Sequence, residues 1–454
     1  MKNLLFLLFT TLSVSIFANN DVSPKDTVTG VIDKAACLVK IDEGKKIFLE
    51  RRYRDALIVF KEASVKDPNS WKPDYWLSQC HYNLKNYGYA KKYAEESLRK
   101  GGKETDPEVF DVLGGSYQRL NSLDTAQIYY QRAMTYIPKN RAKELEIERK
   151  IASVAYAKEE GKVENKRVSL STEINSNYND YSPVISADGK TMYFTSRKSN
   201  TTGGRLNPDD QEYFEDVYRV KWNDVNKIWD SVTNKLERIN STGFDNLCWI
   251  SADGLKAVTV WNNTMTEDKK ITGSSDICEV SYTTKGKWTA PKIIKNKSIN
   301  TSFFEGAATL TADGNTMYFV SDRKGEKTGT DIYVVQKING KTWGEAKILP
   351  AQINTPFAET TPFISPDGRF LFFSSEGHTG MGGYDIFVCE NTGSSWSEPI
   401  NLGGGINSVN NETHFFYSKA LNKIYFAGYN FTGQKGNIDI YEIDMTNFKL
   451  PVNM

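Results

Sequence analysis

The chain has 454 residues, and its 57 Lys and Arg residues almost balance its 56 Asp and Glu residues, for a formal net charge of +1. Without a basic excess to neutralise phosphates, this composition excludes a protein whose main ligand is nucleic acid. The length allows two or three domains, and 39% hydrophobic residues suffice for packed cores. Aromatic residues reach 12%, which favours β-strands because such side chains fit a pleated, half-buried surface.

The first 18 residues have the pattern of a secretory signal peptide. Lys2 gives a positive start, an apolar run extends from Leu4 to Phe17, and Ala18 offers a small residue at the cleavage point. The run is shorter than the roughly 20 residues that span a bilayer as a helix. We therefore predict a periplasmic protein that starts near Asn19 and has no membrane span. Residues 19–35 are expected to form a flexible segment. Exposure at the cell surface and secretion are the alternatives.

Residues 36–162 carry a helical repeat. Alanines recur at Ala56, Ala90 and Ala126, a spacing of about 35 residues that fits one helical hairpin per repeat. Small and large residues recur around them: Gly44, Phe60, Ala63 and Pro68 in the first unit, and Phe110, Leu113, Gly114, Tyr117, Tyr130, Ala133 and Pro138 in the third. This pattern resembles the tetratricopeptide (TPR) repeat, in which a small residue lets two helices approach and an aromatic fills the space beside them. We predict three repeats and a capping helix over Arg141–Gly161.

In such a repeat the first helix of each hairpin lines a concave groove that binds partner proteins. The side chains expected there are Lys45, Tyr75, Gln79, Tyr82, Asn83, Asp111, Gln118 and Arg119. Tyr and Arg are favoured anchors in protein interfaces. The alternative is that some of the tyrosines pack between hairpins.

From residue 163 to residue 450 the pattern changes to short strands separated by tight turns. An Asp-Gly turn followed by an apolar strand occurs at Asp188, Asp253, Asp313 and Asp367, and a fifth copy without Asp-Gly has its strand at Ile424-Tyr425-Phe426. Each copy continues to an aspartate that precedes another apolar strand: Asp216, Asp276, Asp331, Asp385 and Asp439. These repeats predict an all-β domain of five blades.

The outer strand of each blade is expected to end in Ile-Asn followed by Ser or Thr. Four such endings follow the first four copies, whereas the fifth, Ile174-Asn175-Ser176, precedes the first copy. A circular permutation explains this order: Val168–Ile174 would form the outer strand of the last blade. The ring would then be closed by one strand from each end, which removes exposed strand edges. The predicted fold class is therefore multidomain α + all-β, a TPR α-solenoid followed by a five-bladed β-propeller.

The five cassettes resemble PD40 repeats, which are TolB-like and WD40-like propeller repeats. TPR repeats joined to such a propeller are similar to the N-terminal half of OmpA-family envelope proteins, one of which is the periplasmic component of the type IX secretion system. The resemblance implies a scaffold whose partners are envelope, secretion-system or gliding proteins. In that family a peptidoglycan-binding domain follows the propeller. Here the chain ends at Met454 without one, so peptidoglycan contact is expected to be indirect at most.

Catalytic and cofactor motifs are not found in the sequence. There are three histidines, His81, His378 and His414, and two of them near one propeller face fall short of the usual metal-ligand set. We therefore expect no cofactor and no metal site. The five cysteines match no zinc pattern; a Cys37–Cys80 disulfide is one possibility and buried thiols are the other.

A carboxylate stands four residues after each Ser or Thr of the Ile-Asn endings. The five form a predicted ring on one propeller face: Asp180, Asp245, Glu305, Glu359 and Glu412. One interpretation is a cation site or a glycosidase-like acid pair. The other is that each acid accepts hydrogen bonds from its own turn, which the fivefold repetition favours because catalysis needs acids in different environments.

Two segments depart from the repeat and are candidates for recognition loops. They are the insertion Lys198–Glu215 in the first blade and the Gly-rich segment 376–383. Together these patterns predict a non-catalytic periplasmic scaffold. The alternative is a secreted glycan-active or glycan-binding propeller.

Overall fold

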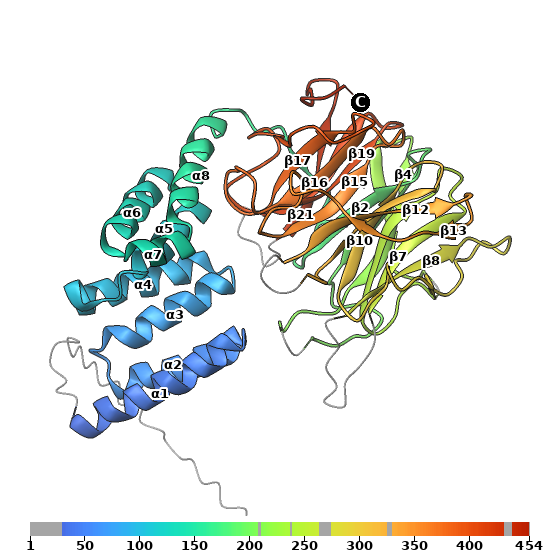
Figure 1. Ribbon diagram of the computed structural model, residues 1–454. Coiled ribbons are helices and arrows are strands. Elements are labelled where there is room, and N and C mark those ends of the chain that lie inside the picture. The colour runs from blue at the N-terminus through green and yellow to red at the C-terminus, as the bar shows by residue number, and fades with distance from the viewer. Residues whose placement is uncertain are drawn as a thin grey trace, which may run out of the picture. The chain divides into compact units, whose positions relative to one another are not determined.

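The computed structural model describes residues 30–207, 210–236, 238–262, 274–324, 329–430 and 438–453 (Figure 1). By its packing the chain divides into two compact units, residues 1–109 and residues 110–454, called here the N-terminal unit and the C-terminal unit. Within the described ranges no helix combines the length and apolar character needed to cross a membrane. The predicted signal peptide lies outside these ranges.

The helices form hairpins, as the repeat predicts. The N-terminal unit contains α1 (Val31–Leu49), α2 (Tyr53–Lys66), α3 (Trp71–Asn83) and α4 (Tyr87–Gly101). They are followed by α5 (Val109–Arg119), α6 (Leu123–Tyr136), α7 (Lys139–Glu144) and α8 (Ile147–Glu160), which belong to the C-terminal unit apart from Val109. Helix α1 begins inside the segment predicted to be flexible. Val31 and Ile32 at its start are both exposed, so this first turn has no buried apolar face from which the sequence could have predicted a helix.

Glycine on one helix of a hairpin allows an aromatic ring of the other to lie against its backbone. A Cβ atom on Gly44 of α1 would lie 2.5 Å from the ring of Phe60 on α2. A Cβ atom on Gly114 of α5 would lie 2.6 Å from the ring of Tyr130 on α6. Both rings are fully buried. The small and aromatic positions of the repeat therefore set how closely the two helices pack.

The strands form five antiparallel sheets, which are the blades of the propeller. The first blade contains β2 (Asp180–Ile185), β3 (Thr191–Ser196), β4 (Asp216–Asn223) and β5 (Ile228–Thr233); the second contains β6 (Phe244–Ile250), β7 (Lys256–Asn262), β8 (Asp276–Ser281) and β9 (Lys292–Ile293). The third contains β10 (Glu305–Leu310), β11 (Thr316–Ser321), β12 (Asp331–Ile338), β13 (Thr342–Trp343) and β14 (Lys347–Ile348). The fourth contains β15 (Glu359–Ile364), β16 (Phe370–Ser375), β17 (Asp385–Glu390) and β18 (Ile400–Asn401).

The fifth blade joins the two ends of the β segment. It contains β19 (Glu412–Ser418), β20 (Lys423–Tyr429), β21 (Ile438–Asp444) and β1 (Val168–Ser169), and β1 pairs antiparallel with β21. The five-bladed fold class and the predicted circular permutation are thereby confirmed. The paired strand is shorter than predicted, because residues 170–174 turn away from β21 after one further backbone hydrogen bond, from Leu170 N to Ile440 O.

The Ile-Asn pairs lie in the turn after each outer strand, not in the strand itself. Their isoleucines, Ile174, Ile239, Ile299, Ile353 and Ile406, are each at most 1% exposed and sit in the five hydrophobic clusters between successive blades. The cluster around Ile174 joins the first blade to the last, since it contains both Phe194 and Ile440.

The asparagines clamp the third strand of each blade. In every blade the Asn side-chain oxygen accepts from the backbone N–H of one residue at 2.8 Å, and its Nδ2 donates to the C=O of the same residue at 2.8–3.0 Å. The pairs are Asn175–Ile440, Asn240–Val217, Asn300–Ile277, Asn354–Ile332 and Asn407–Ile386. Asn175 alone makes this contact between the two ends of the ring.

We expect Asn175→Ala to destabilise the protein by roughly 3 kcal/mol, because it leaves the buried N–H of Ile440 without a partner and its C=O with Leu170 N alone as donor. Urea unfolding measures the loss, and hydrogen exchange should show the β21 amides exposed first. Asn354→Ala should cost a similar amount without this selective exchange at β21. Asn226→Ala, at an exposed turn, serves as the neutral control. Equal exchange at β21 in the Asn175 and Asn354 variants would contradict the closure role.

Candidate protein-binding sites

The N-terminal unit has a cavity of about 230 Å³ between α1 and α3. It is lined by Leu38, Ile41, Asp42, Lys45, Trp71, Lys72, Tyr75, Trp76 and Asp106, and is called here the α1–α3 groove. Two of the residues predicted for the groove, Lys45 and Tyr75, line it. Trp71 and Trp76 were not predicted as groove residues, although both lie within four positions of Tyr75, which was.

The walls of the α1–α3 groove are aromatic. The ring of Tyr75 makes edge contacts with Trp71 and Trp76 at centroid distances of 6.4 and 5.3 Å. The amine of Lys45 lies 5.4 Å from the centre of the Trp76 ring and 3.8 Å from a carboxylate oxygen of Asp42. Leu38 is 48% exposed at the rim. The groove therefore offers apolar surface with both signs of charge beside it.

Three other predicted groove residues on α3 form a ladder of local contacts. Gln79 Nε2 donates to the Tyr75 hydroxyl at 3.0 Å, and Asn83 Nδ2 donates to the Gln79 carbonyl at 2.8 Å. The ring of Tyr82 meets that of Tyr87 edge-on at 5.6 Å, a contact within the α3–α4 hairpin and not between hairpins. None of these three lines the α1–α3 groove.

The remaining predicted groove residues lie in the C-terminal unit and contact their own chain. Asp111 forms an ion pair with Lys150 of α8 at 2.7 Å. Gln118 is 5% exposed and donates to Ser153 Oγ at 3.0 Å and to Met381 O at 2.8 Å. Arg119 Nη1 donates to Val409 O at 2.9 Å. The expectation that Gln118 and Arg119 line an open groove is corrected: both hold α5 against propeller loops.

Helix α8 completes this attachment. Its Ala157 shares an apolar cluster with Met381 and Val409, and Glu160 accepts from Gly404 N at 2.9 Å. Arg149 donates to Glu376 O at 2.9 Å. These contacts place the last helices in the same compact unit as the propeller, and the boundary between the two compact units follows Val109. The domain boundary at residue 162 stays a prediction.

The Gly-rich segment 376–383 is explained by this attachment. A Cβ atom on Gly383 would lie 2.3 Å from Arg119 Nη1 of α5 and 1.9 Å from Asn411 Oδ1, whereas one on Gly382 would lie 2.1 Å from Val409 O of the propeller itself. A second glycine pair has the same role, since a Cβ atom on Gly404 would lie 2.1 Å from Glu160 O. The segment predicted to recognise a partner is therefore occupied by helices of the same unit.

The predicted ring of acids is buried and holds the turns between blades. All five carboxylates are at most 1% exposed, and each accepts from the backbone N–H four residues earlier at 2.6–2.8 Å. The turn hydroxyl also donates to the acid in four blades, from Ser176, Thr301, Thr355 and Ser408. None of the five acids lines the cavity at the mouth of the central channel.

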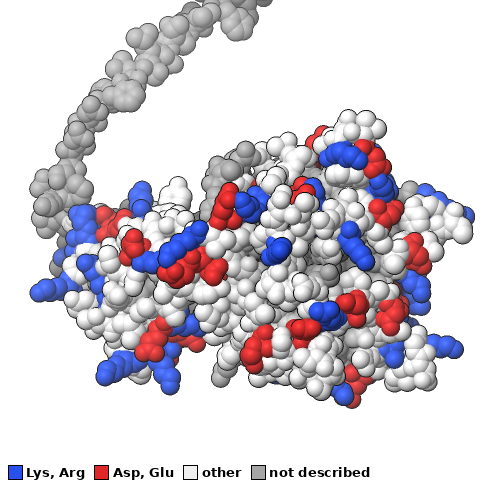
Figure 2. Space-filling view, turned by 90° about the horizontal axis from the view of Figure 1, so that it is seen from above, with Lys and Arg blue, Asp and Glu red and all other residues white. Residues whose placement is uncertain are grey.

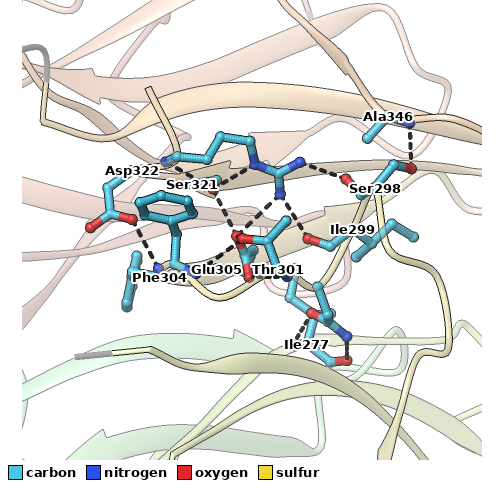
Figure 3. A network of polar contacts seen from close by, with 12 residues as sticks. Ile277, Ser298, Ile299, Thr301, Phe304, Glu305, Ser321, Asp322 and Ala346 are labelled. Atoms are coloured by element: carbon cyan, nitrogen blue, oxygen red, sulfur yellow. Dashed lines mark hydrogen bonds and ion pairs between the residues drawn. The ribbon is translucent and has the colours of Figure 1, made fainter. Parts of the chain in front are cut away.

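The acid of the third blade shows the arrangement most fully (Figure 3). Glu305 accepts from Thr301 and from Ser321 Oγ, and its Oε1 lies 3.2 Å from Arg323 Nη2. The same guanidinium donates to Ser298 O at 2.6 Å and to Ile299 O at 2.7 Å. Every partner belongs to the turn or to the neighbouring strand, so this carboxylate is a structural group.

Burial raises the pKa of several ring acids and of Asp439, the third-strand aspartate of the fifth blade. Burial raises the pKa of Asp245 to about 8 and the pKa of Glu359 to about 7, against hydrogen bonds from Ser241 and Ser375 that lower them. Burial likewise raises the pKa of Asp439 to about 6. Burial also raises the pKa of Asp180 and of Glu412, so these shifts do not single out one acid for chemistry.

The histidines and cysteines are buried or half-buried. Burial lowers the pKa of His81 and of His414 to about 4, and His378 Nε2 lies 2.9 Å from Ile353 O. In the part of the chain that the structure describes, no group of three or more His, Cys, Asp or Glu side chains could hold a metal ion. All five cysteines are free, so Cys37 and Cys80, which share one apolar cluster, form no disulfide here.

Charged side chains of both signs are interspersed over the face of the molecule drawn in Figure 2. Such a surface gives no single-sign field to attract a polyanion.

No family model and no curated protein matches the sequence. Among solved structures, the type III secretion chaperone SycD of Yersinia enterocolitica, in complex with a peptide of the translocator YopD, is similar at 17% identity over 28% of this chain and 99% of that one, with a TM-score of 0.26. The first TPR domain of human RPAP3 is similar at 20% identity over 27% and 97%, with a TM-score of 0.24. The N-terminal domain of stress-induced protein-1 from C. elegans is similar at 16% identity over 26% and 99%, with a TM-score of 0.23.

The raised pKa values predict that the free energy of unfolding falls as pH rises from about 5 to about 8. Unfolded Asp and Glu titrate near about 4, whereas folded Asp245 and Glu359 keep their protons to about 8 and about 7. The folded state binds more protons across this interval, so stability is lost as pH rises. Asp245→Asn should reduce the slope in urea unfolding measured across this range.

Asp188→Asn is the matched control, because Ser186 lowers the pKa of that exposed carboxyl and its effect on stability lies below this pH interval. Identical slopes for the wild type and the Asp245 variant would show that burial of this acid does not control stability.

Proposed function

We propose that this protein is a non-catalytic scaffold that binds a peptide segment of a partner protein in the α1–α3 groove. The observation that carries the proposal is the cavity lined by Trp71, Tyr75 and Trp76, which is open at its rim beside exposed Leu38. Aromatic side chains in a concave site are the usual anchors of protein interfaces. The apolar walls would take a hydrophobic side chain of the peptide.

The groove carries charges that would orient such a peptide. Lys45 and Lys72 lie over the rings of Trp76 and Trp71, and Asp42 and Asp106 line the same cavity. Charges at the rim of an interface mainly set orientation and association rate, whereas the buried anchor sets affinity. A segment with one apolar residue flanked by charged residues fits this arrangement.

The propeller acids support the non-catalytic part of the proposal. General acid–base catalysis needs a proton donor or acceptor within reach of a substrate. The five acids accept instead from the turns that they hold, and the residues lining the channel cavity are different ones.

We infer that the scaffold works in the periplasm, where its partners would be components of type IX secretion, gliding or OmpA-type envelope assemblies. The signal-like N-terminus and the resemblance of the TPR and PD40 patterns support this inference. Peptidoglycan would be reached only through such a partner.

A photo-crosslinking amino acid tests the groove in native cells. At Leu38, on the rim of the groove, we expect a discrete crosslinked product with one partner protein. At Val65, which is more exposed but lies on α2 outside the groove, we expect none. The Leu38 product should weaken in a Lys45→Glu, Lys72→Glu variant, because both cations that flank the tryptophans are reversed. Equal products at Leu38 and Val65, or an unchanged product in this variant, would contradict peptide binding in the groove.

Export is tested separately. We expect the protein purified from native cells to start at Asn19 by intact-mass analysis and to fractionate with the periplasm. A Leu7→Arg variant, with a charge in the apolar run, should keep residues 1–18 and stay in the cytoplasm. A wild-type protein that retains Met1 and its first residues would refute cleavage at Ala18.

A further inference from the structure

The mouth of the propeller channel holds a cavity of about 590 Å³, called here the channel cavity. This volume is in the range of sites that bind small molecules or short peptide segments. Residues from the innermost strands of all five blades line it. Four of these strands carry a non-glycine residue with positive φ at the same position: Ser182, Ala307, Thr361 and His414. The pairing register shifts at each of these points, so the inner strands bulge where they border the cavity.

The lining is mixed, with apolar and uncharged polar groups, and is almost without charge. Among the described lining residues, hydroxyl and amide groups are numerous, Glu215 is the single acidic side chain, and none is Lys or Arg. Burial raises the pKa of Glu215, whereas the hydrogen bond from Tyr181 and the charge of Arg197 lower it. Burial lowers the pKa of His414 to about 4, so this lining residue is neutral near pH 7. A phosphate or carboxylate ligand would find no cation among these residues, whereas a cation would find a carboxylate.

Glu215 departs from the repeat at its position. It immediately precedes the third-strand aspartate of its blade, a position at which the other blades have Ser275, Thr330, Tyr384 and Ile438. In two of those blades the hydroxyl is used structurally: Ser275 Oγ donates to Glu305 O at 2.6 Å, and Thr330 Oγ1 donates to Glu359 O at 2.7 Å. Glu215 instead accepts from the hydroxyl of Tyr181, another lining residue.

Arg197 acts on Glu215 through space, while its ion pairs go to other carboxylates. Arg197 forms ion pairs with Asp210 at 2.7 Å and with Glu212 at 3.1 Å, and its Nε donates to Tyr213 O. Among the described residues, the single charge of Arg197 is therefore shared by Asp210, Glu212 and Glu215. A carboxylate removed from water is costly unless a counter-charge or hydrogen bonds compensate it.

Aromatic rings provide the rest of a cation site. Tyr181, Phe244, Phe304 and Tyr384 are all among the lining residues. Aromatic faces attract ammonium and guanidinium groups, and the attraction grows where water is excluded. The volume is larger than one side chain, so a basic residue could enter together with its neighbours on an extended segment.

We propose that the channel cavity binds a lysine or arginine side chain presented by an extended segment of a second partner protein, with Glu215 as its counter-charge. This rests on the proposed function only in that the basic side chain belongs to a protein partner. It can fail while the α1–α3 groove still binds its own peptide, since the groove residues all lie in the N-terminal unit.

The test uses capped heptapeptides of Gly and Ser with one central residue: lysine, arginine, norleucine or glutamate. Titration into the mature full-length protein, followed by saturation-transfer NMR and calorimetry, should show saturable binding of the lysine and arginine peptides. Norleucine keeps most of the apolar chain without the charge, so its peptide should bind at least about tenfold more weakly, as should the glutamate peptide.

Glu215→Gln should weaken the lysine peptide about tenfold or more, because the amide still accepts from Tyr181 but carries no charge. Glu390→Gln is the matched control, an exposed carboxylate paired with Arg369 at 3.0 Å, and should bind as the wild type does. Thr360→Lys adds a cation to the lining and should abolish binding of the lysine peptide. The thermal melting of each variant shows whether it still folds.

The proposal is overturned by any of three results. They are equal binding of the lysine and norleucine peptides, wild-type affinity in Glu215→Gln, or no binding of either basic peptide at millimolar concentration. Saturable binding of N-acetylglucosamine that Glu215→Gln leaves intact, without binding of the basic peptides, would assign the channel cavity to neutral saccharides instead. In each case the crosslink at Leu38 shows separately whether the scaffold function holds.

Discussion

The paired hydrogen bonds between the side-chain amide of Asn175 and the backbone of Ile440 are the contact on which the ring depends. The other four asparagines make the same pair within one blade, between residues 21–23 apart in sequence, whereas Asn175 and Ile440 are 265 apart. Closing a loop about twelve times longer costs about 2 kcal/mol more in chain entropy. The extra cost is small enough for the apolar cluster around Ile174 and the ion pair of Arg167 with Glu412 to offset it.

The buried acids follow from the same constraint. Each asparagine can reach its strand only if the turn that carries it is held in one conformation. The carboxylate five residues after the asparagine holds that turn by accepting the N–H of the next residue, as Glu359 accepts from Thr355 and thereby orients Asn354. A buried acid loses hydration, which is why its pKa rises, and it recovers part of the loss through two or three donors from the turn.

The sequence was sufficient for the architecture because the architecture is repetitive. The Asp-Gly turns and the third-strand aspartates predict five blades. The fifth Ile-Asn pair, which precedes the first blade, predicts that β1 pairs with β21, as Val168 and Glu442 do. The contacts of Gln118 and Arg119 were not predictable in this way. Helical periodicity shows that a face is covered but not which element covers it, and here the cover is a loop more than 250 residues away. The only sign of these contacts in the sequence was the high glycine content of residues 376–383, and that content is equally typical of a recognition loop.

Repetition also separates structure from recognition within the propeller. A residue that occurs in every blade is explained by the contact that it makes in every blade, as the acids and asparagines are. Glu215 has no counterpart in the other blades, and it lies at the end of the one long insertion, at the border of a cavity that no acid of the ring lines. In the helical part, α5 and α8 already contact propeller loops. Trp71 and Trp76, which line the α1–α3 groove, therefore remain as the candidate recognition residues. The two candidate sites thus lie in different compact units, so each can be altered without changing the residues of the other.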